Sequence, residues 1–172
     1  MAIAAAREWE IAQWTIEKKD HPRAPGTPQL AASVIQSDAA WEATSNNAGL
    51  AWILKTGEQS MTGMKGVSFI SSALIAEGLA MREAMAACKL KGLRKVRFES
   101  DSSQLITAIN RNDPPLELYG IVQDIVCMAR DFEIAIFFWI PRLKNVNADL
   151  LAKNALIVFG QEVAGNLLPP PN

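Results

Sequence analysis

The sequence predicts one α/β domain built on a five-stranded mixed sheet with helices on both faces. Three closely spaced strand-like segments come first, which indicates an antiparallel meander. Helical and strand-like segments then alternate, which indicates two further strands that run parallel. The 172 residues are 49% hydrophobic and 20% charged, so the chain has the composition of a globular protein with a sizeable core.

The chain divides into an accessory helix, a proline-rich linker, the α/β domain and a C-terminal tail, at residues 1–19, 20–32, 33–160 and 161–172. The accessory helix is amphipathic, with Ile3, Trp9 and Ile16 at roughly helical spacing. Three prolines and a glycine within the eight residues from His21 mark the linker. His21 is the single histidine of the chain, and we expect it to be solvated there.

The meander is predicted from three runs of strand-forming residues. The first strand covers 33–38 and ends at Asp38. The second, at 49–55, is more continuously apolar, and a turn at 56–58 separates it from a third strand at 59–69.

A long helix follows the meander. Ser72 is its expected N-cap, and Gly92 stops it after Lys91. Its apolar row is Leu74, Met81, Met85 and Cys88. Glu77 falls inside that row, where a carboxylate is costly unless it is paired or binds a metal. The alternative is that Glu77 lies at the rim of the packed face and points to water.

The second half of the domain begins with a strand that ends in an acidic residue. Val96 and Phe98 alternate with polar residues, and Asp101 follows at the start of a helix. Open α/β sheets tend to place their chemistry at this end of a strand. The alternative is that Asp101 is a plain N-cap. This strand is predicted to cover 93–100. It is followed by helices at 102–110 and 118–130, a strand at 132–140 and a last helix at 148–159.

Four acidic residues occupy element ends or a packing face: Asp38, Glu77, Asp101 and Asp149. If the first and fourth strands are neighbours, Asp38 and Asp101 stand side by side, and two helices can add the others. Four carboxylates close together repel strongly unless divalent cations neutralise them. Oxygen ligands suit Mg²⁺ or Mn²⁺, and two such ions about 4 Å apart are the usual device for attack of water on a phosphodiester.

The motifs around these residues are Ser-Asp38-Ala-Ala-Trp, Ala-Glu77, Glu-Ser-Asp101-Ser and Ile-Pro-Arg142 followed by Asn145-x-x-x-Asp149-x-Leu-Ala. Together, across about residues 33–158, they resemble the ribonuclease H-like superfamily. They are especially similar to the reverse-transcriptase-associated ribonuclease H type domains of plants, which occur at the ends of retroelement-derived proteins. The rest of a longer reverse-transcriptase-like protein is therefore an expected partner.

This resemblance implies a metal-dependent endonuclease that cuts the RNA strand of RNA–DNA hybrids. Asp38, Glu77, Asp101 and Asp149 would hold two Mg²⁺ or Mn²⁺ ions, one activating water and the other stabilising the leaving 3′ oxygen. The product would carry a 5′-phosphate. We assign contacts with the nucleic acid to Ser102, Arg142, Asn145 and Trp41.

Two features of the chain depart from the pattern that the resemblance implies. Well-studied active members carry a histidine ten residues before the last aspartate, thought to shuttle protons, and this chain has Trp139 there. Members also often place asparagines just ahead of the helix glutamate, where this chain has Ala73 and Leu74.

Composition adds expectations about the setting of the protein. Cys88 and Cys127 lie in apolar helical patterns and are expected to be reduced core residues, which places the protein inside the cell, in nucleus or cytoplasm. No signal peptide or membrane-spanning segment is evident, so no membrane partner is expected. The net charge of −1 gives no global attraction to nucleic acid. Basic residues instead gather at 89–97. They are interpreted either as a solvated charged rim or as residues that contact phosphates.

Three hypotheses follow. The first is the metal-dependent nuclease, favoured because all four carboxylates are present. The second is a catalytically weak or inactive module that binds nucleic acid, suggested by the missing histidine. The third is a structural part of a larger protein.

Overall fold

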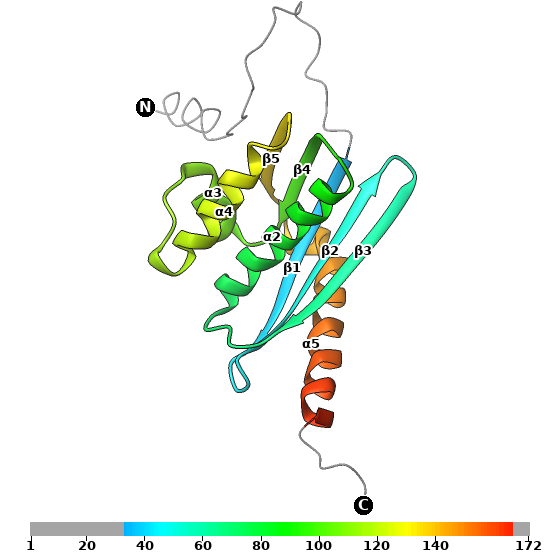
Figure 1. The fold of residues 1–172 in the computed structure, drawn as a ribbon, viewed down its shortest axis with the longest axis vertical. Coiled ribbons are helices and arrows are strands. Elements are labelled where there is room, and N and C mark those ends of the chain that lie inside the picture. The colour runs from blue at the N-terminus through cyan, green and yellow to red at the C-terminus, as the bar shows by residue number, and fades with distance from the viewer. Residues whose placement is uncertain (1–32, 167–172) are drawn as a thin grey trace, which may run out of the picture.

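A computed structural model describes residues 33–166 and shows a five-stranded sheet in the order β3-β2-β1-β4-β5 (Figure 1). β1 pairs antiparallel with β2 and β2 with β3, whereas β1, β4 and β5 run parallel. The strands are β1 (Ser33–Glu42), β2 (Asn47–Thr56), β3 (Gln59–Val67), β4 (Lys95–Ser100) and β5 (Ile134–Trp139). The predicted mixed sheet is confirmed; the accessory helix and the linker lie outside the described residues.

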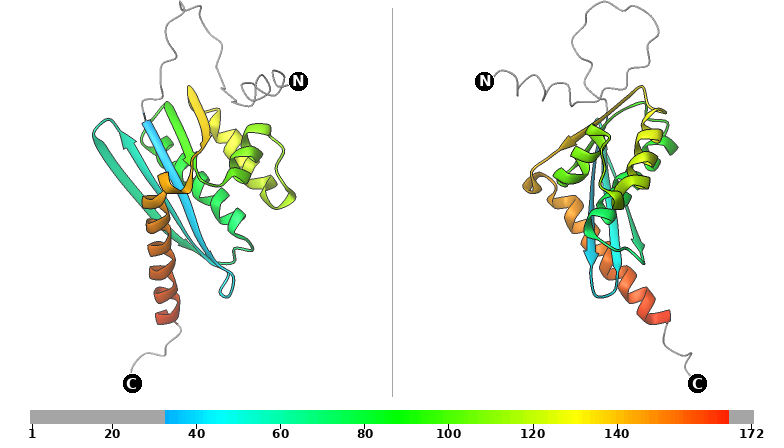
Figure 2. Two further views of the ribbon diagram at one scale, coloured as in Figure 1. Left: turned by 180° about the vertical axis from the view of Figure 1, so that it is seen from behind. Right: turned by 90° about the vertical axis from the view of Figure 1, so that its left-hand side faces the viewer.

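Helices cover both faces of the sheet. They are α2 (Ala73–Leu90), α3 (Ser103–Arg111), α4 (Tyr119–Ala129) and α5 (Val146–Asn166), with single 3₁₀ turns η1 (Leu116–Leu118) and η2 (Arg142–Lys144). α2 packs on β1 and β2, with α3 and α4 beside it, and α5 packs on β1, β2 and β3 from the other side (Figure 2). No helix among residues 33–166 is long and apolar enough to cross a membrane.

The main core lies between the sheet and the layer formed by α2, α3 and α4. Alternate residues of the strands face it, because side chains along a strand point to opposite sides. Phe98 of β4 is completely buried, stacks on Phe137 and meets Phe132 edge to face. Met81 and Met85 of α2 are also fully buried there, as the predicted apolar row requires.

The two cysteines differ in environment. Cys88 is buried in the core, as predicted, but Cys127 is exposed, so its assignment to the core is wrong. The buried residues of α4 are Val122, Ile125 and Ala129. Cys127 follows Ile125 by two positions and therefore lies on a different side of the helix.

Serine side chains cap two of the helices. Ser72 Oγ accepts a hydrogen bond from the backbone N–H of Ile75 at the start of α2, which confirms the predicted cap. Ser102 does the same for α3 by accepting from Leu105 N–H. The cap of α3 is thus the serine, and the carboxylate of Asp101 remains available for another role.

α5 lies very close to β2 and is longer than predicted. It begins at Val146 and runs to Asn166, so it extends past the expected end at residue 159. A Cβ atom on Gly49 would lie 2.1 Å from the carbonyl oxygen of Ala152. Only glycine leaves room for the helix backbone at this point of the sheet.

Candidate active site

β1 reaches further than predicted, and this extension places Asp38. The strand runs to Glu42 rather than ending at Asp38, because its pairing with β2 continues to the Glu42–Asn47 pair. Its pairing with β4 stops at Gln36–Glu99. Asp38 therefore lies just beyond the point where β1 loses its parallel neighbour, at the end of the sheet where Asp101 follows β4.

Three predicted carboxylates converge at this end of the sheet. Asp38 from β1, Glu77 from α2 and Asp101 after β4 each present an oxygen within 4.8 Å of the oxygens of the other two. The Asp38 residue is only 4% exposed. Glu77 Oε2 is buried and has no hydrogen-bond partner among the described residues, so this oxygen does not reach water. The predicted neighbourhood of Asp38 and Asp101 is confirmed.

Burial and neighbouring negative charges make Asp38 and Glu77 hard to ionise. Burial, with the charge of Asp101 next, raises the pKa of Asp38 from 3.8 to about 8, although Arg142 opposes the rise. Burial also raises the pKa of Glu77 well above its usual value, and the charges of Asp38 and Asp101 add to the rise. A bound cation would stabilise the ionised forms of these two carboxyl groups, which burial and neighbouring charges oppose.

Asn145 holds two of the carboxylates in place. Its side-chain Nδ2 donates to the Ser37 carbonyl at 3.0 Å, to Asp38 Oδ1 at 3.2 Å and, at 3.4 Å, to Asp101 Oδ1. The residue is completely buried, so its side chain does not reach the surface of the chain, and its contact with nucleic acid stays a prediction. Its role is to orient acidic side chains, and its own Oδ1 has no partner among the described residues.

Asp149 lies in the first turn of α5 but outside the group of three. Its carboxylate accepts from Arg142 at 3.2 Å and from Lys153 at 2.6 Å. Its negative charge still reaches the site, since it contributes to raising the pKa of Asp38. The structure therefore shows a three-carboxylate cluster, with Asp149 close by and engaged by two cations.

The other predicted contact residues differ in exposure and in the partners they bind. Ser102 caps α3 and is partly exposed, whereas Arg142 is largely exposed and bound to Asp149. Trp41 is half-buried, and its indole N–H donates to the carbonyl of Ile70 at 2.8 Å. Trp139 is 51% exposed, and its indole N–H donates to the Asp101 carbonyl at 3.0 Å.

The cluster fits a divalent cation. Its donors are carboxylate oxygens, the ligands that Mg²⁺ and Mn²⁺ prefer. The oxygen of Glu77 that lacks a partner supports this fit, because a buried acceptor without a partner is costly in a finished structure. The residues present can therefore hold a metal ion between β1, α2 and the end of β4.

Comparisons with known proteins agree with this geometry. A family profile described as "Reverse transcriptase-like" matches residues 36–155. No curated protein sequence shows significant similarity to the chain.

Solved structures show the same fold. The N-terminal RNase H domain of a Mycobacterium tuberculosis protein superposes with a TM-score of 0.69 at 18% identity, covering 76% of this chain and 97% of that one. RNase H1 from the archaeon Halobacterium salinarum gives 0.67 at 20% identity, covering 72% and 96%. LC11-RNase H1, isolated from compost, gives 0.65 at 17% identity, covering 72% and 96%, and was solved in complex with an RNA/DNA hybrid. At these identities the likeness establishes the ribonuclease H fold.

Proposed function

Since the chain belongs to the reverse transcriptase-like family, we propose that it is a metal-dependent endonuclease that hydrolyses the RNA strand of RNA–DNA hybrids. The observation that carries the proposal is the convergence of Asp38, Glu77 and Asp101 from three separate elements. Nothing in the packing of the core requires these three acids to meet, and their meeting is costly without a cation.

Divalent cations at this site, two Mg²⁺ or Mn²⁺ ions in the proposal, would activate the attacking water and stabilise the leaving 3′ oxygen. Asp38, Glu77 and Asp101 hold the metal, and Asn145 keeps two of them oriented. Asp149 is the proposed fourth ligand, and it must exchange part of its contact with Arg142 or Lys153 to take this role.

The surroundings of the cluster supply the proposed contacts with the hybrid. Arg142 is exposed and can exchange its carboxylate partner for a phosphate of the backbone. Ser102 directly follows Asp101, and Trp41 follows Asp38 on β1. Both are proposed to contact the backbone and sugars of the hybrid. Hybrids of this type are recognised by shape and 2′-hydroxyls rather than by base sequence.

A second candidate function rests on Trp139. An indole N–H only donates hydrogen bonds and cannot shuttle protons, and here it is bound to the Asp101 carbonyl. We therefore propose that turnover is slow; the alternative is a catalytically weak or inactive module that binds nucleic acid. Binding would then persist without cleavage.

The test is incubation of the full chain with an end-labelled RNA–DNA hybrid and Mg²⁺ or Mn²⁺. The expected result is cleavage of the RNA strand to products with a 5′-phosphate, abolished in Asp101→Asn. Asp113→Asn is the matched control, because Asp113 is an exposed carboxylate that does not belong to the cluster. Intact RNA with retained hybrid binding would overturn the nuclease and support the binding module. Loss of both would leave only a structural role.

A further inference from the structure

A pocket lies on the part of the sheet that α5 leaves uncovered. α5 packs on β1, β2 and β3, while β4 and β5 lie beside it in the rear view (Figure 2). Here the sheet is hollowed by a pocket of about 350 Å³, a volume within the range of small-molecule sites. Its walls come from β1, β4, β5 and the η2 turn: Gln36, Arg97, Glu99, Phe138, Trp139, Ile140 and Lys144.

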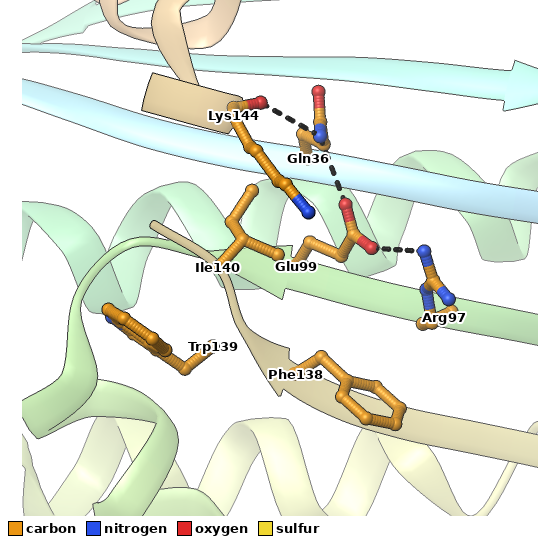
Figure 3. A pocket seen from close by; sticks show the side chains of 7 residues that line it. All are labelled: Gln36, Arg97, Glu99, Phe138, Trp139, Ile140 and Lys144. Carbon is orange, nitrogen blue, oxygen red and sulfur yellow. Dashed lines mark hydrogen bonds and ion pairs between the residues drawn. The ribbon is translucent and has the colours of Figure 1, made fainter. Parts of the chain in front are cut away.

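The floor of the pocket is a polar network on a buried carboxylate. Glu99 is 5% exposed; one of its oxygens accepts from Gln36 Nε2 at 3.0 Å and the other is paired with Arg97 Nη2 at 2.5 Å (Figure 3). Gln36 also donates to the Lys144 carbonyl, which fixes the η2 turn over β1. Both oxygens of Glu99 are thus engaged, and its charge is balanced inside the protein.

Two donors remain without an acceptor. Arg97 Nε is buried and has no partner among the described residues, and a buried donor of this kind calls for an explanation. The guanidinium lies 5.6 Å from the centre of the Phe138 ring, which holds it in place. Lys144 is exposed and forms no ion pair with another residue in the range 33–166. Its side chain extends toward Glu99 and Ile140 (Figure 3).

The charge of the pocket favours an anion. Arg97 and Lys144 bring two positive charges against the single negative charge of Glu99. Glu99 balances one of them, so a ligand with a negative group at Lys144 and the exposed part of the Arg97 guanidinium would balance the other. The volume exceeds what a bare phosphate fills, and the half-buried Phe138 ring offers an apolar face for the remainder of the ligand.

We propose that this pocket binds a nucleotide, with its phosphate at Lys144 and Arg97 and its base or sugar against Phe138. The choice of a nucleotide over another phosphorylated molecule rests on the proposed function, because the pocket adjoins the acidic cluster. Gln36 precedes Asp38 by two residues on β1, and Lys144 is followed directly by Asn145. The nucleotide is either free or part of a single strand next to the cleavage site.

The test is a calorimetric titration of the full chain in EDTA with adenosine 5′-monophosphate, inorganic phosphate, adenosine and a 5′-phosphorylated RNA tetranucleotide. We expect saturable binding of the monophosphate, with adenosine and inorganic phosphate each at least fivefold weaker. Lys144→Ala and Phe138→Leu should each weaken binding at least fivefold. Lys55→Ala is the matched control and should leave binding unchanged, because it removes an exposed lysine on β2 away from the pocket.

The proposal would be overturned by the absence of saturable binding, or by binding that neither Lys144→Ala nor Phe138→Leu affects. Inorganic phosphate binding as tightly as the monophosphate would also overturn it, because the pocket would then be an anion site only. Tetranucleotide binding at least tenfold tighter than the monophosphate identifies a strand as the source, and equal binding identifies a free nucleotide. Repeating the titration with Asp101→Asn separates this site from the nuclease, since no cleavage or metal is needed for binding.

Discussion

Replacing Asp38 by asparagine should stabilise the metal-free protein at neutral pH. The folded protein keeps a proton on Asp38 up to about pH 8, whereas the unfolded chain loses that proton near the ordinary pKa of 3.8. Between these values the folded state binds one more proton than the unfolded state. The free energy of unfolding therefore falls as pH rises, by about 1.4 kcal/mol per pH unit for one proton.

The size of the effect follows from this slope. From about pH 5.5 to about pH 7.5, the wild type should lose about 3 kcal/mol that the asparagine variant does not lose. The substitution is nearly isosteric, and the amide oxygen of the new side chain can still accept from Asn145. The two proteins should thus have similar stability in acid, and the variant should be the more stable one at neutral pH.

Urea titrations of the full chain in EDTA at several pH values measure this difference. Asp113→Asn is the control, because it makes the same chemical change at an exposed carboxylate outside the acidic cluster. Added Mg²⁺ should raise the stability of the wild type most at the higher pH and have little effect on Asp38→Asn. Parallel curves for wild type and Asp38→Asn would refute the reasoning, since Asp38 would then ionise alike in both states.

Three further substitutions test the site and the fold. Trp139→His restores the histidine that the family resemblance implies and should raise hybrid cleavage at least about tenfold in a single-turnover assay; an unchanged rate would remove the proton-shuttle explanation. Asn145→Ala removes the donor to two carboxylates and should weaken Mg²⁺ binding about 10–100-fold by calorimetry, whereas equal affinity would contradict its orienting role. Gly49→Ala should destabilise the protein by about 2 kcal/mol or more in urea, because its Cβ would lie 2.1 Å from Ala152 O. Gly120→Ala, with no atom within 4 Å of the new Cβ, should not destabilise it.

The convergence of three acids could be predicted from sequence because local patterns fix it. Alternation along a strand places Asp101 directly after β4, and helical spacing places Glu77 on the packed row of α2. Once β1 and β4 are neighbours, Asp38 and Asp101 must meet at one end of the sheet. The resemblance to a known family then named the chemistry, which periodicity alone leaves open.

The contacts that complete the site could not be predicted in the same way. Asn145 is assigned to nucleic-acid contact from the family resemblance, yet its amide meets Asp38, 107 positions away in sequence. Asp149 shares that motif, but Arg142 and Lys153 determine where its carboxylate points. The contacts of both side chains depend on how η2 lies relative to the sheet. The spacing of residues along the sequence does not determine that placement.

The opposite environments of the two thiols have a practical consequence. Burial raises the pKa of Cys88 to about 12, so this thiol reacts with alkylating reagents only when α2 separates from the sheet. Cys127 is exposed and should be alkylated at once. A thiol probe should therefore react with Cys127 immediately and with Cys88 only after a delay. The delay records how often the core around Cys88 opens, and a cation that binds only the folded protein should lengthen it wherever this opening is part of global unfolding.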